Sequence, residues 1–168
     1  SPDSQKISFW QIDANQIRDY YMMNSTDSLY SQVIPVEYPK VGESPSPARI
    51  GVIDLASQKT TWLKIPGDPQ QHYLPRMEWN NPDLILVQQL SRKQNHSKIY
   101  AVNVPANEAK VISEEIEDTW IDVFSNRENV YGLTYRYEFK WLNDKKSFLW
   151  FSEKDGCRHV YSICLDGK

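Results

Sequence analysis

The sequence predicts an all-β fold. Short apolar runs alternate with polar residues at a period of two, and Pro, Asn, Asp and Gly separate them at the spacing of strands and turns. Six Trp, ten Tyr and five Phe stand against only six Gly, and aromatic side chains are favoured on pleated sheets. We therefore expect little helix and roughly fourteen short strands.

The first four predicted strands contain the most distinctive loop. They are Ile7–Ile12, Ile17–Met23, Leu29–Val36 and Ala48–Leu55. A short polar turn separates the first two, which are predicted to pair as a hairpin. Between the third and fourth, Tyr38–Pro47 carries prolines that cannot donate to a central ladder, so this segment is predicted to be a loop or exposed arm.

The remaining predicted strands are each bounded by turn residues. They are Thr60–Ile65, Tyr73–Trp79, Leu84–Leu90, Lys98–Val104, Lys110–Ser113, Thr119–Phe124, Val130–Tyr135, Glu138–Trp141, Ser147–Ser152 and His159–Cys164.

Two stretches share one local pattern. In Trp79–Val87 and Trp141–Trp150 an aromatic residue ends a strand, a polar turn follows and an apolar strand returns, and Ser1–Trp10 fits the same pattern without its first strand. Repeated hairpins are typical of four-stranded propeller blades. We predict a partial β-propeller of about three antiparallel blades, the outer two incomplete, with blade openings near 1–12, 73–90 and 138–152. A β-sandwich would satisfy the same strand count.

Charge and cysteine content narrow the function classes. The 168 residues suit one domain, and 19 Lys plus Arg against 22 Asp plus Glu give a net charge of −3. Such a chain lacks the basic surface that nucleic acid requires. Cys157 and Cys164 are too few to define a disulfide framework, and their redox state stays open.

Two clusters contain residues suited to binding an ammonium group or a metal ion, but their positions in the sequence argue against such sites. Glu114 and Glu115 would suit an ammonium group, but they follow a completed hairpin and are predicted to lie in a solvated turn. Cys157, His159 and Cys164 are the nearest approach to a metal-ligand set. On an extended strand Cys164 would face away from the other two, so a packed hairpin and no metal site are predicted.

Several motifs follow one another along the chain. They are Tyr38–Gly42 with Ser46-Pro47 and Ile50–Leu55, then Tyr73–Trp79, then Gln89–Asn95, then Trp120–Asp122 followed by Phe139–Trp150 and Ser152–Tyr161. In this order they resemble the N-terminal β-propeller of the dipeptidyl peptidase IV family, which are prolyl oligopeptidase-type serine exopeptidases. Gln89–Asn95 is the most specific match, being similar to the family's Leu-Asn-Arg-x-Gln-Asn, with Ser91 where Asn is common.

The resemblance implies a function for a longer parent chain. Such enzymes release N-terminal X-Pro and X-Ala dipeptides, and their propeller controls substrate access and helps to form a homodimer. The catalytic Ser, Asp and His lie in a C-terminal α/β-hydrolase domain, the Ser in a Gly-x-Ser-x-Gly elbow that these residues lack. The family's amine-binding Glu-Glu pair is expected upstream of Ser1. The parent is thus expected to be an enzyme, and this stretch alone to hold no catalytic residue.

The resemblance also implies partners. They are the hydrolase domain of the same chain, peptide substrates and a second copy of the parent, with no metal or organic cofactor. The propeller is expected outside the cytoplasm, in a secreted, periplasmic or membrane-anchored protein. The alternative is a non-enzymatic propeller or sandwich that binds proteins, including an inactive family member.

Tyr135 and Arg136 are the candidate substrate-facing residues. Family members present an aromatic residue and an Arg to the substrate pocket from the loop just before this strand. A guanidinium beside aromatic rings suits recognition of a carbonyl or carboxylate. The alternative is a strand-end Arg stacked on its neighbours.

Residues 24–47 are predicted to form a projecting arm that is an oligomer contact in the parent. Polar Asn24–Ser28 begins the excursion, and alternating apolar residues predict a short strand pair. The candidate contact residues are Tyr30, Val33 and Tyr38. In the family that this chain resembles, an insertion at this point is part of the dimer interface. The alternative is a loop folded back on its own blade.

Overall fold

The computed structural model describes the chain except for residues 124–127, 131–132, 136–138, 143 and 168, and gives only the backbone of 128–130 and 133–135. The described part contains no helix, and therefore none that could cross a membrane. Its strands are β1 (Lys6–Ile12), β2 (Asp19–Asn24), β3 (Gln32–Glu37), β4 (Ala48–Asp54), β5 (Thr60–Trp62), β6 (His72–Asn81), β7 (Leu84–Ser91), β8 (His96–Asn103), β9 (Glu108–Ile116), β10 (Glu128–Val130), β11 (Leu133–Tyr135), β12 (Lys140–Trp141), β13 (Ser147–Ser152) and β14 (His159–Cys164).

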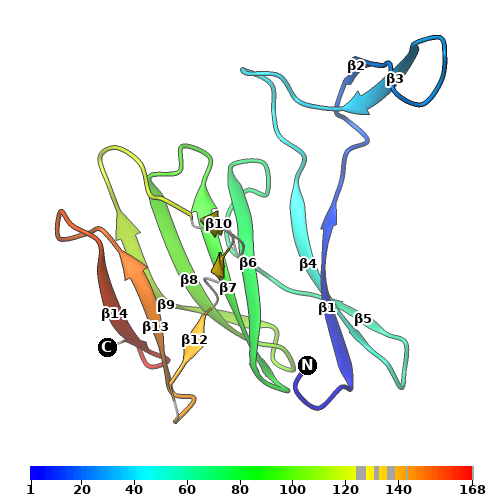
Figure 1. Cartoon of the computed structure of the whole chain (residues 1–168). Helices are drawn as coiled ribbons and strands as arrows, with labels where there is room; N and C mark the ends of the chain where they lie inside the picture. The colour runs from blue at the N-terminus through cyan, green and yellow to red at the C-terminus, as the bar shows by residue number, and fades with distance from the viewer. Residues whose placement is uncertain (124–127, 131–132, 136–138, 143, 168) are drawn as a thin grey trace.

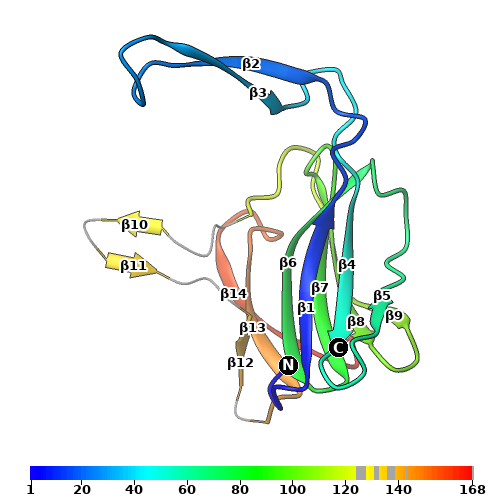
Figure 2. The ribbon, with the colours of Figure 1, turned by 90° about the vertical axis from the view of Figure 1, so that its right-hand side faces the viewer.

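Three antiparallel sheets stand side by side, with their strands running in similar directions (Figures 1 and 2). The first blade has the order β1-β4-β5, the second β6-β7-β8-β9, and the third β12-β13-β14. The hairpins β2–β3 and β10–β11 are separate two-stranded sheets. The prediction of an all-β fold with about three blades, the outer two incomplete, is confirmed.

The second blade is buried on both faces because β7 is a continuous apolar run. Successive side chains of a strand point to opposite faces, so Ile85 and Val87 pack toward Ile50 of the first blade, while Leu86 packs with Phe148 of the third. All five of these side chains are fully buried. The four-stranded sheet is therefore the central layer of the molecule.

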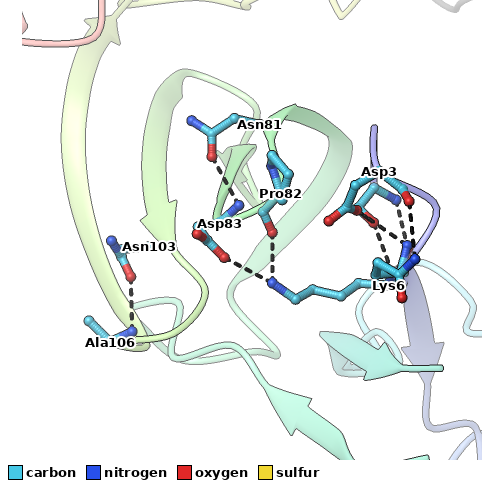
Figure 3. Close-up of polar contacts among 9 residues, drawn as sticks. Asp3, Lys6, Asn81, Pro82, Asp83, Asn103 and Ala106 are labelled. Atoms are coloured by element: carbon cyan, nitrogen blue, oxygen red, sulfur yellow. Dashed lines mark hydrogen bonds and ion pairs between the residues drawn. The ribbon is translucent and has the colours of Figure 1, made fainter. Parts of the chain in front are cut away.

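Polar side chains connect the blades at their edges. Lys6 Nζ lies 2.9 Å from both the Asp83 carboxylate and the Pro82 carbonyl oxygen, which joins β1 to the β6–β7 turn (Figure 3). Trp79 Nε1 donates to Ser8 Oγ at 2.9 Å. On the other side, buried Asn80 donates to the Lys145 carbonyl in the third blade at 2.8 Å. These contacts hold the blades in register beyond their apolar packing.

The predicted hairpin between the first two strands is wrong. β1 pairs with β4, with Phe9 opposite Gly51, while β2 pairs with β3. Gly51 has no side chain, so the rings of Phe9 and Trp62 meet over it edge to face, with centroids 5.6 Å apart. This packing favours β4 as the partner of β1 and makes the chain between them an excursion.

Two further expectations for the second blade and its exit are wrong. Glu114 and Glu115 lie in β9, opposite Lys98 and Ser97 of β8, and not in a turn. Residues 119–123 form no strand, because the chain instead follows the β7–β8 turn: the Ile121 amide donates to the Gln94 carbonyl at 2.7 Å.

The predicted single strand Val130–Tyr135 is also wrong. Its backbone forms two short strands, β10 and β11, which pair antiparallel with Val130 opposite Leu133.

Candidate functional site

The most conspicuous exposed feature is the β2–β3 hairpin. It projects from one end of the first blade, away from the three sheets (Figures 1 and 2). Among the described strands, its two strands pair only with each other, in a register that sets Tyr20 opposite Val36 and Met23 opposite Val33. A two-stranded ribbon cannot bury its own faces, so its apolar side chains remain in solvent.

The two faces of the hairpin differ in how far their own chain covers them. On one face the centroids of the Tyr20 and Tyr38 rings lie 6.1 Å apart, and Lys40 Nζ lies 5.0 Å from the centroid of the Tyr20 ring. On the other face Met23 is 74% exposed and Val33 65% exposed. An apolar surface of this kind on a protein typically marks an interaction site.

The tip of the hairpin is organised by local polar contacts. Asn24 Oδ1 accepts from the Thr26 amide at 3.0 Å, and Asn24 Nδ2 donates to Asp27 at 2.6 Å. Ser28 Oγ donates to the Tyr30 carbonyl. These side-chain contacts fix the turn, as the polar composition of this segment suggests.

The three predicted contact residues all belong to this region. Tyr30 lies in the loop between the strands, Val33 in β3, and Tyr38 directly after β3. All three are exposed. The strand pairing itself begins at Asp19, before the polar segment from which the sequence pattern started the arm. The apolar run Tyr20–Met23 could have indicated this start, but from the sequence the same run could equally pair with the preceding strand β1.

The side chains of the second predicted site, Tyr135 and Arg136, are not among those that the structure describes. Tyr135 ends β11, where only the backbone is described, and Arg136 lies outside the described residues. Their substrate-facing role stays a prediction.

Glu114 and Glu115 do not form a joint carboxylate site, because neighbours in a strand point to opposite faces. Glu114 lies 2.6 Å from His96 Nε2 and 3.4 Å from Lys98 Nζ, and these hydrogen bonds lower its pKa. Glu115 accepts from Ser152 Oγ of the third blade at 2.8 Å, and burial raises its pKa. Each carboxylate is thus committed to a different neighbour.

A cavity of about 460 Å³ lies between β9 and the third blade, and Glu115, Lys154 and Tyr161 help to line it. Asp155 accepts a hydrogen bond from the Tyr161 hydroxyl and raises its pKa to about 12. Lys154 Nζ lies 4.0 Å from the Tyr161 ring centroid, and Glu115 accepts from Ser152 Oγ, so these polar groups contact neighbours in the same wall. The cavity is thus the junction between two blades.

The cysteines lie as the predicted hairpin requires. β13 and β14 pair antiparallel, with Ser147 opposite Cys164, and Cys157 is exposed in the turn between them. Both thiols are free. Within the described ranges, no three His, Cys, Asp or Glu side chains gather closely enough to hold a metal ion.

Comparisons with known proteins agree with the three-blade arrangement. The family described as the dipeptidyl peptidase IV (DPP IV) N-terminal region matches residues 1–168. The chain belongs to this family. Among solved structures, dipeptidyl peptidase 4 of Porphyromonas gingivalis superposes with a TM-score of 0.81 at 26% identity, over 99% of this chain and 22% of that one. A putative dipeptidyl aminopeptidase IV from Bacteroides ovatus gives 0.79 at 22% identity with the same coverage.

Curated relatives of this DPP IV N-terminal region include proteins named as inactive and proteins named as probable dipeptidyl peptidases. "Inactive dipeptidyl peptidase 10" of Rattus norvegicus is 25% identical over 135 residues, 79% of this chain and 17% of that protein. "Probable dipeptidyl peptidase 4" of Aspergillus flavus is 21% identical over 176 residues, 99% of this chain and 22% of that protein. The chain thus spans about a fifth of the length of these relatives.

Proposed function

We propose that these residues are the non-catalytic propeller portion of a DPP IV-type serine exopeptidase, which releases N-terminal X-Pro and X-Ala dipeptides. The observation that carries the proposal is the family match along the whole chain, together with the superposition on dipeptidyl peptidase 4 of Porphyromonas gingivalis. The catalytic residues belong to a C-terminal α/β-hydrolase domain of the same parent. The propeller restricts the peptides that reach that domain, outside the cytoplasm, and Tyr135 and Arg136 face them.

A second candidate has a specific observation in its favour. Two of the relatives are named as inactive dipeptidyl peptidase 10. A parent without a functional nucleophile would use the same blades to bind other proteins. Neither the blades nor the β2–β3 hairpin need to differ between the two cases.

Turnover of a Gly-Pro chromogenic amide by the full-length parent separates these candidates. An active parent hydrolyses the amide, and a serine-directed inhibitor stops the reaction. Turnover at the buffer rate by folded full-length protein rejects the peptidase and leaves the binding function. Loss of turnover in the Arg136→Ala variant, with Lys140→Ala in β12 as the control, would support the substrate-facing role.

We further propose that the predicted arm, residues 24–47, is a contact between two copies of the parent. The exposed apolar surface of the β2–β3 hairpin supports this, since nothing else in the described part of the chain covers it. Tyr30→Asp with Val33→Asp places two charges on that surface. We expect the dimer dissociation constant in sedimentation equilibrium to rise tenfold or more, equivalent to about 1.4 kcal/mol. An unchanged constant would show that the arm is not an interface.

A further inference from the structure

The β2–β3 hairpin is attached to the blades by few contacts. Two chain segments, 13–18 and 38–47, connect it to β1 and β4, and its strands pair with no strand of a blade. One backbone hydrogen bond joins the two connections, from the Asp13 amide to the Pro47 carbonyl at 3.0 Å. Two loop connectors of this length can act as a hinge unless other contacts fix the direction of the hairpin.

A side chain of the second blade reaches this connection. Arg92 lies in the turn after β7, where its amide donates to the Gln71 carbonyl at 3.0 Å. Its guanidinium Nη2 donates to the Glu43 carbonyl at 2.5 Å, across 49 positions of sequence. Glu43 belongs to the segment that leads from the hairpin to β4, so this bond ties the returning connector to another blade.

The surroundings of Arg92 make this bond stronger than an ordinary surface contact. The bond is partly buried, and the other terminal nitrogen, Nη1, is buried with no hydrogen-bond partner in the described part of the chain. A charged donor withdrawn from water gains more from each acceptor that it keeps, and loses more when that acceptor leaves. The Glu43 carbonyl is the side chain's only acceptor among the bonds that the structure describes.

A second tie to Glu43 provides a natural comparison. Arg18, on the outgoing connector, lies 3.5 Å from the Glu43 carboxylate, but its side chain is 86% exposed. Exposed ion pairs of this geometry contribute little, because solvent screens them and both side chains must be ordered. The two arginines therefore contact the same residue with very different consequences.

We propose that Arg92 is a positioning residue for the β2–β3 hairpin: through the Glu43 carbonyl it fixes the direction of the hairpin relative to the second blade. Without this bond the connectors retain the Asp13 amide bond to the Pro47 carbonyl, the Glu43 amide bond to the Lys40 carbonyl and the exposed Arg18 pair. All three lie within the connectors, so none of them ties the hairpin to the second blade. The inference concerns the base of the hairpin and does not depend on what its faces bind.

Hydrogen exchange of the full-length parent, read by mass spectrometry, tests this role. We expect Arg92→Gln to speed exchange in the 38–47 peptides about tenfold or more, equivalent to about 1.4 kcal/mol, while β6–β9 exchanges as before. The matched control Arg18→Gln should change the same peptides by less than about threefold. Arg92→Lys keeps one charged donor and should give an intermediate rate.

Two results would overturn the proposal. One is exchange in 38–47 that stays within about twofold of the unaltered protein in Arg92→Gln. The other is an Arg18→Gln effect as large as that of Arg92→Gln. If Arg92→Gln raises exchange throughout the blades, Arg92→Lys decides: a rise confined to 38–47 supports the role, and a general rise rejects it. Sedimentation of the same samples reports dimerisation separately, so failure of the arm as an interface leaves this readout intact.

Discussion

The second blade and the β2–β3 hairpin are built from similar residues and have opposite surroundings. Leu86 in β7 is fully buried, whereas Leu29 in the hairpin loop is 92% exposed. Both regions are antiparallel strands that contain runs of consecutive apolar residues. The blade has a sheet packed on each face, and no sheet in the described part of the chain packs on the hairpin. Burial is therefore decided by the sheets that neighbour a strand and not by the composition of the strand.

The largest effect expected from this comparison comes from the same deletion in both regions. Leu86→Ala removes buried carbons that pack with Ile99, Ile112 and Phe148, and should destabilise the blade by about 2–5 kcal/mol. Leu29→Ala should stay within about 0.5 kcal/mol. Urea unfolding of the full-length protein, monitored by hydrogen exchange of the β7 peptides, measures the stability cost of each substitution. A cost at Leu29 close to that at Leu86 would mean that the hairpin is packed against something in solution.

The sequence predicted the strands better than their partners, and these two regions show why. Period-two alternation identified both Ile7–Ile12 and Ile17–Met23. The first of these begins one residue after the start of β1 and ends at the same residue. The pairing of β1 with β4 depends on Gly51 lying under two rings brought from β1 and β5, which no local pattern contains. Similarly, Arg92 and Glu43 meet across 49 positions. The family resemblance predicted where the arm lies in the sequence, but not that Arg92 contacts the connector at its base.

A smaller effect separates two glycines, one in a blade and one in the connector of the hairpin. A Cβ at Gly51 would lie 2.6 Å from Phe9 Cζ and 2.9 Å from Trp62 Cζ3, so Gly51→Ala should destabilise the first blade by about 1–3 kcal/mol. Gly42 has open space around it but a φ of +92°, so Gly42→Ala should cost about 1 kcal/mol through backbone strain alone.

The two glycine variants should also differ in where the cost falls. Gly51→Ala should raise exchange in β1 and β4, whereas Gly42→Ala should raise it only in 38–47. Wild-type exchange in β4 of Gly51→Ala would contradict the tight packing of the first blade.

The smallest expected effect is a pH dependence confined to the blade. His72 begins β6 and is buried, and its Nδ1 lies 3.2 Å from Gln89 Nε2, which in turn donates to the Pro66 carbonyl at 2.6 Å. Burial lowers the pKa of His72 below its ordinary value, and the charge of Asp68 offsets part of this. The unfolded chain therefore binds a proton more readily than the folded one.

The sign of the effect follows from that difference. The neutral ring's contribution to stability is complete above the unfolded value of about 6.5 and is lost as pH falls through the lower folded value. Between pH 7 and pH 5 we expect exchange at the β6 and β7 amides to rise by about twofold to fivefold, after correction for the intrinsic pH dependence of exchange. His72→Gln has no proton to bind and should remove this increment, while the β2–β3 hairpin, which does not contact His72, should show the same profile in both proteins. An increment that persists in His72→Gln would assign the pH dependence to another group of the blade. That group would not be Glu115, because a carboxylate whose pKa is raised on folding stabilises the fold as pH falls.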